Sequence, residues 1–245
     1  MAPAESIDPS RHLELHGVAT HFSGFDLGPL DLDMALGERW VIAGANGSGK
    51  TTTVRIISGR LPDFEGTVTV LGADVRESPV AVRARIGLLP EQRAGFGWMT
   101  VREHLDFVSA FHPEWDPDYA ARLQAGFHLR DEAKVGTLSK GMRLKLALVA
   151  AEAFRPPILL LDEPTSGVDP VAREGLLDLI DEAVPPGGNR LLIFSTHILE
   201  DLDRLRPQIA VLAGGRLQRM GAADELLGPD RDDPRRRALI REMHP

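Results

Sequence analysis

An eight-residue glycine-rich stretch constrains this chain more than any other feature of its sequence. Residues 44–51 read GANGSGKT and match the phosphate-binding pattern G-x-x-x-x-G-K-[ST] at every fixed position. Residues 39–43 are typical of a short buried strand and residues 52–57 of a helix, which is the context that such a loop requires. Its glycines let backbone N–H groups approach phosphates, and Lys50 adds a charge for the β- and γ-phosphates. The chain is therefore predicted to bind a nucleoside triphosphate.

A second motif closes the apolar run 158–161 with two adjacent carboxylates. We expect Asp162 to hold Mg²⁺ together with the Thr51 hydroxyl, and Glu163 to polarise the water that attacks the γ-phosphate. The residues expected to surround the phosphates are Gly44, Asn46, Gly47, Ser48, Gly49, Lys50, Thr51 and Thr52.

Length and composition limit the remaining possibilities. The chain has 245 residues, enough for one large domain with an inserted subdomain. It has no cysteine, which excludes disulfides and thiolate metal sites and fits a cytosolic setting. Its apolar runs are much shorter than the roughly 20 residues that span a bilayer, so any membrane role must come from a partner. The net charge of −8 argues against a broad nucleic-acid surface, and no nucleic acid is expected to bind.

Apolar patterning predicts an α/β fold. Residues 1–11 are expected to be a loose lead-in, followed by one domain over 12–228 and a tail over 229–245 that is solvated and carries a short helix at most. Glycines and a proline are expected to separate two short antiparallel strands before the phosphate loop. Strands are expected over 12–15, 30–34, 66–71, 85–89, 158–162 and 191–195, a helix over 171–184 and a hairpin over 209–220.

Helical periodicity replaces the strand pattern from residue 100 to about 153. One helix is expected to bury Val101, Leu105, Val108 and Phe111 on a single face. The sequence therefore predicts a helical subdomain inserted over residues 93–153, approximately.

Residues 138–142, LSKGM, precede a helix and resemble the LSGGQ signature of the ATP-binding cassette (ABC) ATPases. Lys140 and Met142 depart from that pattern. Ser139 and Gly141 at a helix N-terminus are suited to clamp a γ-phosphate, although Ser139 would act as a helix N-cap in any case. The position of the motif between the phosphate loop and the acidic strand end makes the resemblance specific.

The remaining motifs of the family follow in order. Residues 166–169, SGVD, resemble the D-loop and assign Asp169 to the nucleotide site, while His197 resembles the switch histidine that contacts the γ-phosphate. In the segment resembling the Q-loop, both Glu91 and Gln92 are candidates for contact with Mg²⁺ and the attacking water. Phe22 resembles the aromatic residue that stacks on adenine, and Phe25 competes with it.

This resemblance covers residues 12–227 and implies an ABC ATPase fold. That fold has a mixed sheet around the phosphate loop, an N-terminal antiparallel β subdomain and the inserted helical subdomain. It implies ATP and Mg²⁺ as cofactors and a second ATPase subunit, identical or related, because the signature of one subunit closes over the phosphate loop of the other. It also implies a separate membrane permease, placing the chain on the cytoplasmic face of the cell membrane. Finer features resemble the bacterial export-type branch.

Two other functions compete with a transporter subunit. A soluble ABC ATPase of DNA repair or translation usually has two cassettes or a long coiled-coil insertion, for which this chain has no room. A degenerate regulatory cassette is opposed by the intact Lys50, Asp162, Glu163 and His197. In the resembled family, residues 93–100 line a groove for a short permease helix; Phe96, Trp98 and Met99 suit that role, or else pack under the helical subdomain.

Overall fold

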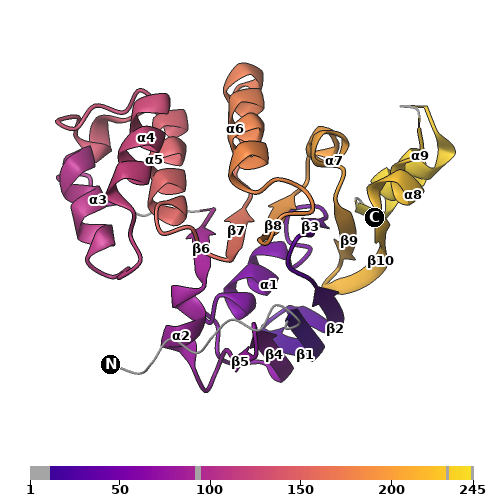
Figure 1. The fold of residues 1–245 in the computed structure, drawn as a ribbon. Coiled ribbons are helices and arrows are strands. Elements are labelled where there is room, and N and C mark those ends of the chain that lie inside the picture. Colours follow the sequence, from indigo (N-terminus) through magenta and orange to yellow (C-terminus); the bar gives the residue numbers. More distant parts are fainter. Residues whose placement is uncertain (1–11, 92–94, 230–231, 244–245) are drawn as a thin grey trace.

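Two β-sheets organise the part of the chain that this computed structural model describes, residues 12–91, 95–229 and 232–243 (Figure 1). The strands are β1 (Leu13–Phe22), β2 (Phe25–Met34), β3 (Arg39–Ala43), β4 (Glu65–Val70), β5 (Ala73–Asp74), β6 (Ile86–Leu89), β7 (Ile158–Asp162), β8 (Leu191–Thr196), β9 (Gln208–Ala213) and β10 (Arg216–Ala222). The helices are α1 (Lys50–Ile57), α2 (Pro79–Ala84), α3 (Val101–Ser109), α4 (Pro117–Gly126), α5 (Lys140–Glu152), α6 (Pro170–Ala183), α7 (Leu199–Leu205), α8 (Ala223–Leu227) and α9 (Pro234–Met243), with a 3₁₀ turn at Val135–Thr137.

One sheet is antiparallel, in the order β2-β1-β4-β5, and the other is mixed, in the order β10-β9-β3-β8-β7-β6. Strands β9, β3, β8, β7 and β6 of the mixed sheet run parallel, and β10 pairs antiparallel with β9 as the predicted hairpin. The predicted α/β class with its separate antiparallel sheet is confirmed.

Strand β3 is buried on both faces because its side chains alternate between two hydrophobic clusters. Trp40 and Ile42 pack with α1 and the antiparallel sheet, whereas Val41 and Ala43 pack on the other face with α5, α6 and α7. Helix α1 is therefore enclosed between the two sheets, and the loop that joins β3 to α1 is supported from both sides.

Strands β1 and β2 are longer than the sequence predicts, ten residues each, and a tight turn joins them at residues 23–24. The prediction that glycines separate short strands is wrong, because these glycines interrupt the pairing register instead. Gly28, at φ 89°, passes so close to β1 that a Cβ there would lie 2.0 Å from the Val18 carbonyl oxygen.

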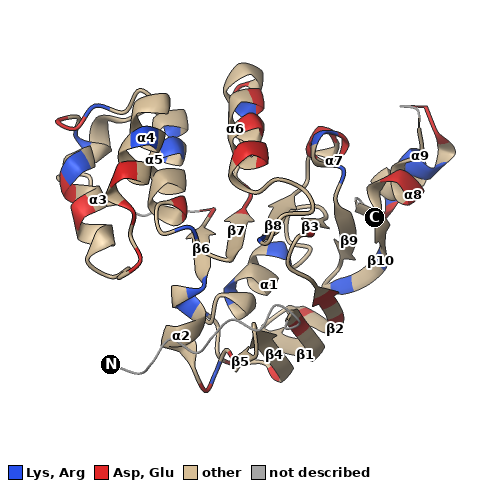
Figure 2. Cartoon of the chain, in the orientation of Figure 1, with Lys and Arg blue, Asp and Glu red and all other residues tan. Residues whose placement is uncertain are grey.

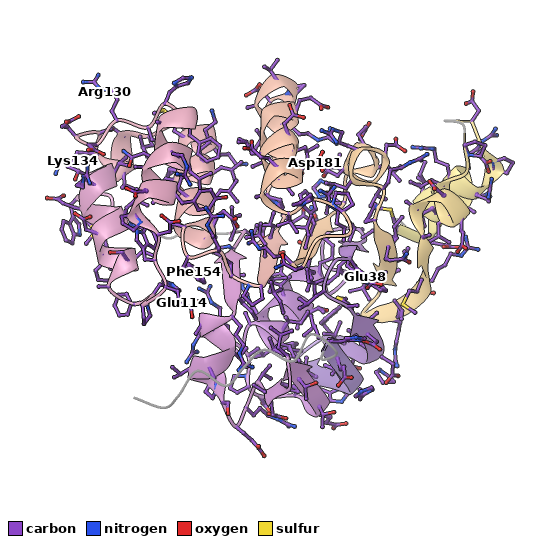
Figure 3. The ribbon with its side chains drawn as sticks, viewed as in Figure 1. Glu38, Glu114, Arg130, Lys134, Phe154 and Asp181 are labelled. Carbon is purple, nitrogen blue, oxygen red and sulfur yellow. The ribbon has the colours of Figure 1, made fainter. Side chains whose placement is uncertain are left out.

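Helices α3, α4 and α5 form a group between β6 and β7, on the left of Figure 1. Thr100 and Glu103 start α3 with a reciprocal capping box. Val101 and Leu105 are buried as predicted, but Phe111 is exposed because α3 ends at Ser109 and the residue lies beyond it. At the other side of the group Phe154 follows α5 and packs in the core, facing the mixed sheet (Figure 3).

Ion pairs connect α6 to β3 and α7. Asp181, near the end of α6, accepts from Arg39 at the start of β3 (Figure 3). Arg204 of α7 lies 2.7 Å from Asp178 of α6, and both helices carry acidic and basic residues along their length (Figure 2). These contacts hold α6 and α7 over the same face of the mixed sheet.

Helix α9 belongs to the packed part of the chain, and the prediction of a solvated segment is wrong for it. Leu239 and Met243 are fully buried against α8 and β9, and Arg236 forms an ion pair with Asp203 of α7. The Met243 carbonyl also accepts a hydrogen bond of 2.9 Å from the backbone N–H of Ala45. Composition alone misses this packing because an arginine run surrounds two apolar positions on one helix face.

None of the helices in the described ranges has the length and apolar character needed to span a membrane.

Candidate nucleotide site

Three neighbouring parallel strands bring the predicted motifs to one edge of the mixed sheet. Strand β3 leads into the phosphate loop, β7 ends in Asp162 and β8 ends next to His197. The register pairs Asp162 with Ser195, so the chain leaves β7 and β8 at the same level. Because parallel strands end at the same edge, motifs more than a hundred residues apart in the chain converge there.

The phosphate loop has the backbone shape that a phosphate requires. Gly47 and Gly49 adopt left-handed φ values of 80° and 111°, and a Cβ on Gly49 would lie 2.5 Å from Leu27 Cδ1. Beside the loop is a cavity of about 380 Å³, lined among others by Asn46, Gly47, Gly49, Lys50, Thr51 and Thr52. Ser48 Oγ is buried with no hydrogen-bond partner among the described residues. Ser48 and Gly44, both expected near the phosphates, are not among the residues that line this cavity.

Lys50 has three partners within its own chain. Its Nζ donates to the carbonyl oxygens of Gly44 at 2.7 Å and Ala45 at 2.9 Å. It also lies 3.0 Å from Glu163 Oε1, in an ion pair without hydrogen-bond geometry, and both side chains are only 5–6% exposed. A phosphate bound by Lys50, as predicted, would compete with this ion pair.

Asp162 and Thr51 form the candidate metal ligands. Asp162 Oδ1 accepts from Thr51 Oγ1 at 3.3 Å and from Ser195 Oγ at 2.6 Å. Burial raises the pKa of Asp162 and the charges of Glu91 and Glu163 add to the rise, while the two hydroxyl hydrogen bonds oppose it. One carboxylate and one hydroxyl fit Mg²⁺, which normally takes one or two carboxylates and completes its shell with phosphate oxygens and water.

Glu163 is held in an unusual backbone conformation. Its φ of 47° lies in the left-handed region, which costs a non-glycine residue about 1–2 kcal/mol. The Glu163 N–H donates to both the carbonyl and the hydroxyl of Ser195, at 3.2 and 2.9 Å, and Oε2 lies 2.9 Å from His197 Nδ1. The strain is thus retained where it orients a carboxylate toward the cavity.

Glu91 lies where the sequence places it. It follows β6 and lines the cavity, close enough for its charge to raise the pKa of Asp162. Gln92, the alternative ligand, lies outside the described residues, so the choice between the two stays a prediction.

Phe25, rather than Phe22, lines the cavity. Strand β2 lies beside the turn between β9 and β10, where the Gly28 N–H donates to the Gly215 carbonyl at 2.7 Å. Phe25, at the start of β2, therefore lies close to the phosphate loop: its ring would be 3.3 Å from a Cβ placed on Gly49. Phe22 is on β1, one strand farther away, and is 45% exposed. The geometry therefore does not support the expected role of Phe22 and favours its competitor.

The signature and D-loop residues do not line this cavity. Ser139 Oγ accepts from Met142 N at 3.2 Å and caps α5, whose first turn includes Gly141. Asp169 Oδ1 accepts from Ala172 N at 3.0 Å and caps α6. Within a single chain these residues stabilise helix N-termini.

Sequence reasoning missed two polar residues that support the site. Ser195 bonds to both Asp162 and Glu163. Asp201, fully buried on α7, accepts at 2.7 Å from the hydroxyls of Thr165 and Thr196. The only sequence signal for Asp201 is an acid four positions after His197, preceded by Glu200 and followed by Leu202.

Comparison with known proteins agrees with this geometry. The family model for the ABC transporter matches residues 27–166. The phospholipid-transporting ATPase ABCA7 of Homo sapiens is 38% identical over 198 residues, which is 77% of this chain and 9% of that protein. The daunorubicin resistance ATP-binding protein DrrA3 of Streptomyces coeruleorubidus is 38% identical over 212 residues, covering 83% of this chain and 66% of DrrA3. The chain thus spans about a tenth of the length of the ABCA relatives that it matches.

Solved structures share the fold. The structure of an ATP-binding subunit of an ABC transporter superposes with a TM-score of 0.82 at 25% identity, over 96% of this chain and all of the other. A bacterial Atm1-family ABC exporter with ATP bound gives 0.80 at 22% identity, over all of this chain and 44% of the exporter. The chain therefore belongs to the ABC transporter family, as an ATP-binding cassette.

Proposed function

We propose that this cassette hydrolyses ATP in the presence of Mg²⁺ and drives export through a separate membrane permease. The observation that carries the proposal is the position of Glu163, next to the metal-ligand candidate Asp162 and in contact with both Lys50 and His197. A buried carboxylate between a phosphate-binding lysine and a histidine is the arrangement expected of a general base for water attack.

Each residue has a distinct part in the reaction. Lys50 leaves Glu163 and binds the β- and γ-phosphates, which frees the carboxylate to accept a proton from water. His197, bonded to Glu163 through Nδ1, keeps that carboxylate oriented and offers its other ring nitrogen to the γ-phosphate. Thr51 and Asp162 would hold Mg²⁺, which supplies charge neutralisation at the phosphate oxygens.

A second cassette completes each site in this proposal. Ser139, Gly141 and Asp169 lie outside the cavity of their own chain, so their predicted contacts with nucleotide require another subunit. The partner is an identical or a related chain. Solved ABC cassettes include a dimeric one, with a TM-score of 0.77 to this chain at 22% identity, which supports a compatible shape and nothing finer.

An exposed row of aromatic rings supports docking to a permease. Ring centroids are 5.7 Å apart for Phe96 and Trp98, 5.8 Å for Phe96 and Phe107, and 5.2 Å for Phe107 and Phe111. All four side chains are exposed, and Trp98 is 68% exposed. Met99, expected beside them, is buried instead and packs with the core. Exposed apolar surface of this kind is typical of a partner-binding site. It supports the part of this proposal in which the chain binds its permease at the cytoplasmic face of the membrane.

Replacement of the proposed base tests the function. Glu163→Gln should lower phosphate release by about 10²–10⁴-fold, because the amide accepts no proton from water. The variant should remain folded in a thermal melt. Normal turnover by Glu163→Gln would remove Glu163 from the role, and no turnover by the wild-type chain with its partners present would favour a regulatory cassette.

A further inference from the structure

Asp201 connects the two loops that carry the proposed catalytic groups. Asp201 is the third residue of α7, and its side chain has no exposed surface. A single oxygen, Oδ2, accepts hydrogen bonds of 2.7 Å from Thr165 Oγ1 and from Thr196 Oγ1. Thr165 follows Glu163 by two residues and Thr196 immediately precedes His197. One carboxylate oxygen therefore binds the loop after β7 and the last residue of β8, next to His197.

Arg173 fixes the other oxygen of the same carboxylate. Its Nε donates to Asp201 Oδ1 at 2.8 Å from the first turns of α6, the helix that follows the Glu163 loop. Thr196 Oγ1 in turn accepts from the Ile198 N–H at 3.0 Å, which shapes the backbone on both sides of His197. With both oxygens engaged, the carboxylate cannot rotate without breaking a contact to one of the two loops.

The pairing of strands β7 and β8 does not by itself place these loops. The register ends at Asp162 and Ser195, and Glu163 turns away from the strand direction at once with a φ of 47°. The distance of 2.9 Å between Glu163 Oε2 and His197 Nδ1 therefore depends on contacts beyond the strand pairing, which include the Glu163 N–H bonds to Ser195 as well as those of Asp201. Among the described residues, Asp201 accepts side-chain hydrogen bonds from both loops at once.

We propose that Asp201 is a positioning residue for ATP hydrolysis. By accepting hydrogen bonds from Thr165 and Thr196, it keeps the Glu163 and His197 side chains within hydrogen-bond distance of each other. This rests on the function proposed above, in which Glu163 is the base. Asp201 does not line the cavity, and its proposed effect is transmitted through the two loops. Its loss should lower the rate of the chemical step and leave ATP binding nearly unchanged, since Lys50 and the phosphate loop lie outside the network.

Asp201→Asn in the full chain tests the inference against a matched control. Glu152 is also a buried carboxylate, bonded to Arg190 at 2.6 and 2.8 Å and to the Tyr119 hydroxyl at 3.1 Å, and it lies at the end of α5 away from the cavity. Asp201→Asn should lower kcat by about 10-fold to 100-fold with KM for ATP within about twofold, as expected when catalytic groups are misplaced. Glu152→Gln should lower the melting temperature comparably and leave kcat unchanged. Nitrogen chemical shifts of the His197 ring, assigned with His197→Ala, should move in Asp201→Asn and not in Glu152→Gln.

A normal kcat in folded Asp201→Asn, an unchanged His197 spectrum, or an equal loss of kcat in Glu152→Gln would each overturn the inference. If Asp201→Asn does not fold, Thr165→Val removes one of the two hydroxyl bonds; it should lower kcat in the same direction, and a normal kcat there would also overturn it. Glu163→Gln, measured in parallel, distinguishes failure of the proposed function from failure of the positioning role. Normal turnover in Glu163→Gln refutes the proposed function, whereas an inactive Glu163→Gln beside a fully active Asp201→Asn refutes only the positioning role.

Discussion

Glu163→Gln should bind ATP more tightly than the wild-type chain, in addition to losing turnover. Lys50 Nζ and Glu163 Oε1 are 3.0 Å apart and nearly buried, and the lysine has to break this pair to reach a phosphate. At an effective dielectric constant of about 20, two unit charges at this distance attract by about 5.5 kcal/mol. If only a quarter of that energy, about 1.4 kcal/mol, opposes binding in the wild type, its removal tightens ATP binding about tenfold.

Equilibrium titration with a non-hydrolysable ATP analogue and Mg²⁺ measures this effect without interference from turnover. Glu91→Gln is the matched control, because it removes a carboxylate from the same cavity that has no ion pair with Lys50. Both variants are also titrated without Mg²⁺, so that the loss of a candidate metal contact at Glu91 does not enter the comparison. A general loss of negative charge would raise the affinity of both variants for the analogue equally, whereas release of Lys50 would raise the affinity of Glu163→Gln alone. An unchanged or weaker affinity in Glu163→Gln, or an equal gain in Glu91→Gln, would refute the reasoning.

Three further outcomes are expected. Lys50→Ala should weaken binding of the same analogue by about 10-fold to 100-fold, because a charge-assisted hydrogen bond contributes roughly 1.5–3 kcal/mol; wild-type affinity in a folded variant would contradict the phosphate-loop assignment. Trp98→Ala should barely change the melting temperature, because the side chain is mostly exposed. It should prevent copurification with the permease, because an aromatic anchor contributes about 2 kcal/mol or more to binding. Normal assembly of the variant with the permease would contradict the docking role. Burial and the neighbouring Glu152 raise the pKa of Tyr119, the only tyrosine of the chain, to about 12. Tyrosinate absorbance should therefore titrate near pH 12. The contribution of Tyr119 to the free energy of unfolding should be complete below the ordinary tyrosine pKa of about 10 and should be lost as the pH rises toward 12. An absorbance midpoint near pH 10 would show that the tyrosine is not held in this environment.

The sequence predicts those parts of the site whose residues are contiguous and lie at strand ends. The phosphate loop, Asp162 and Glu163 each follow a short apolar strand, and strand order alone brings them together. His197 is identified in the same way, from the end of β8. In each case the local pattern and the global fold agree, which is the condition for a reliable inference from sequence.

The residues that the sequence leaves out depend on packing between elements. Asp201 has its role because α7 lies over two loops from different strands, and its own neighbours in the chain say nothing of those loops. The choice of Phe25 over Phe22 depends on which strand of the hairpin lies beside the β9–β10 turn. Helix α9 is misjudged because its charges outnumber the apolar residues that bury it.

Changes to helix α9 reach the phosphate loop through one backbone hydrogen bond. The Ala45 N–H in that loop donates to the carbonyl of Met243, the last residue of α9, so a change that displaces the helix removes a hydrogen-bond acceptor next to the candidate nucleotide site. A chain shortened at Gly228 loses that acceptor and uncovers the apolar surface of β9 on which Leu239 and Met243 rest. Trimming the arginine-rich helix to improve crystals would therefore also change the phosphate loop.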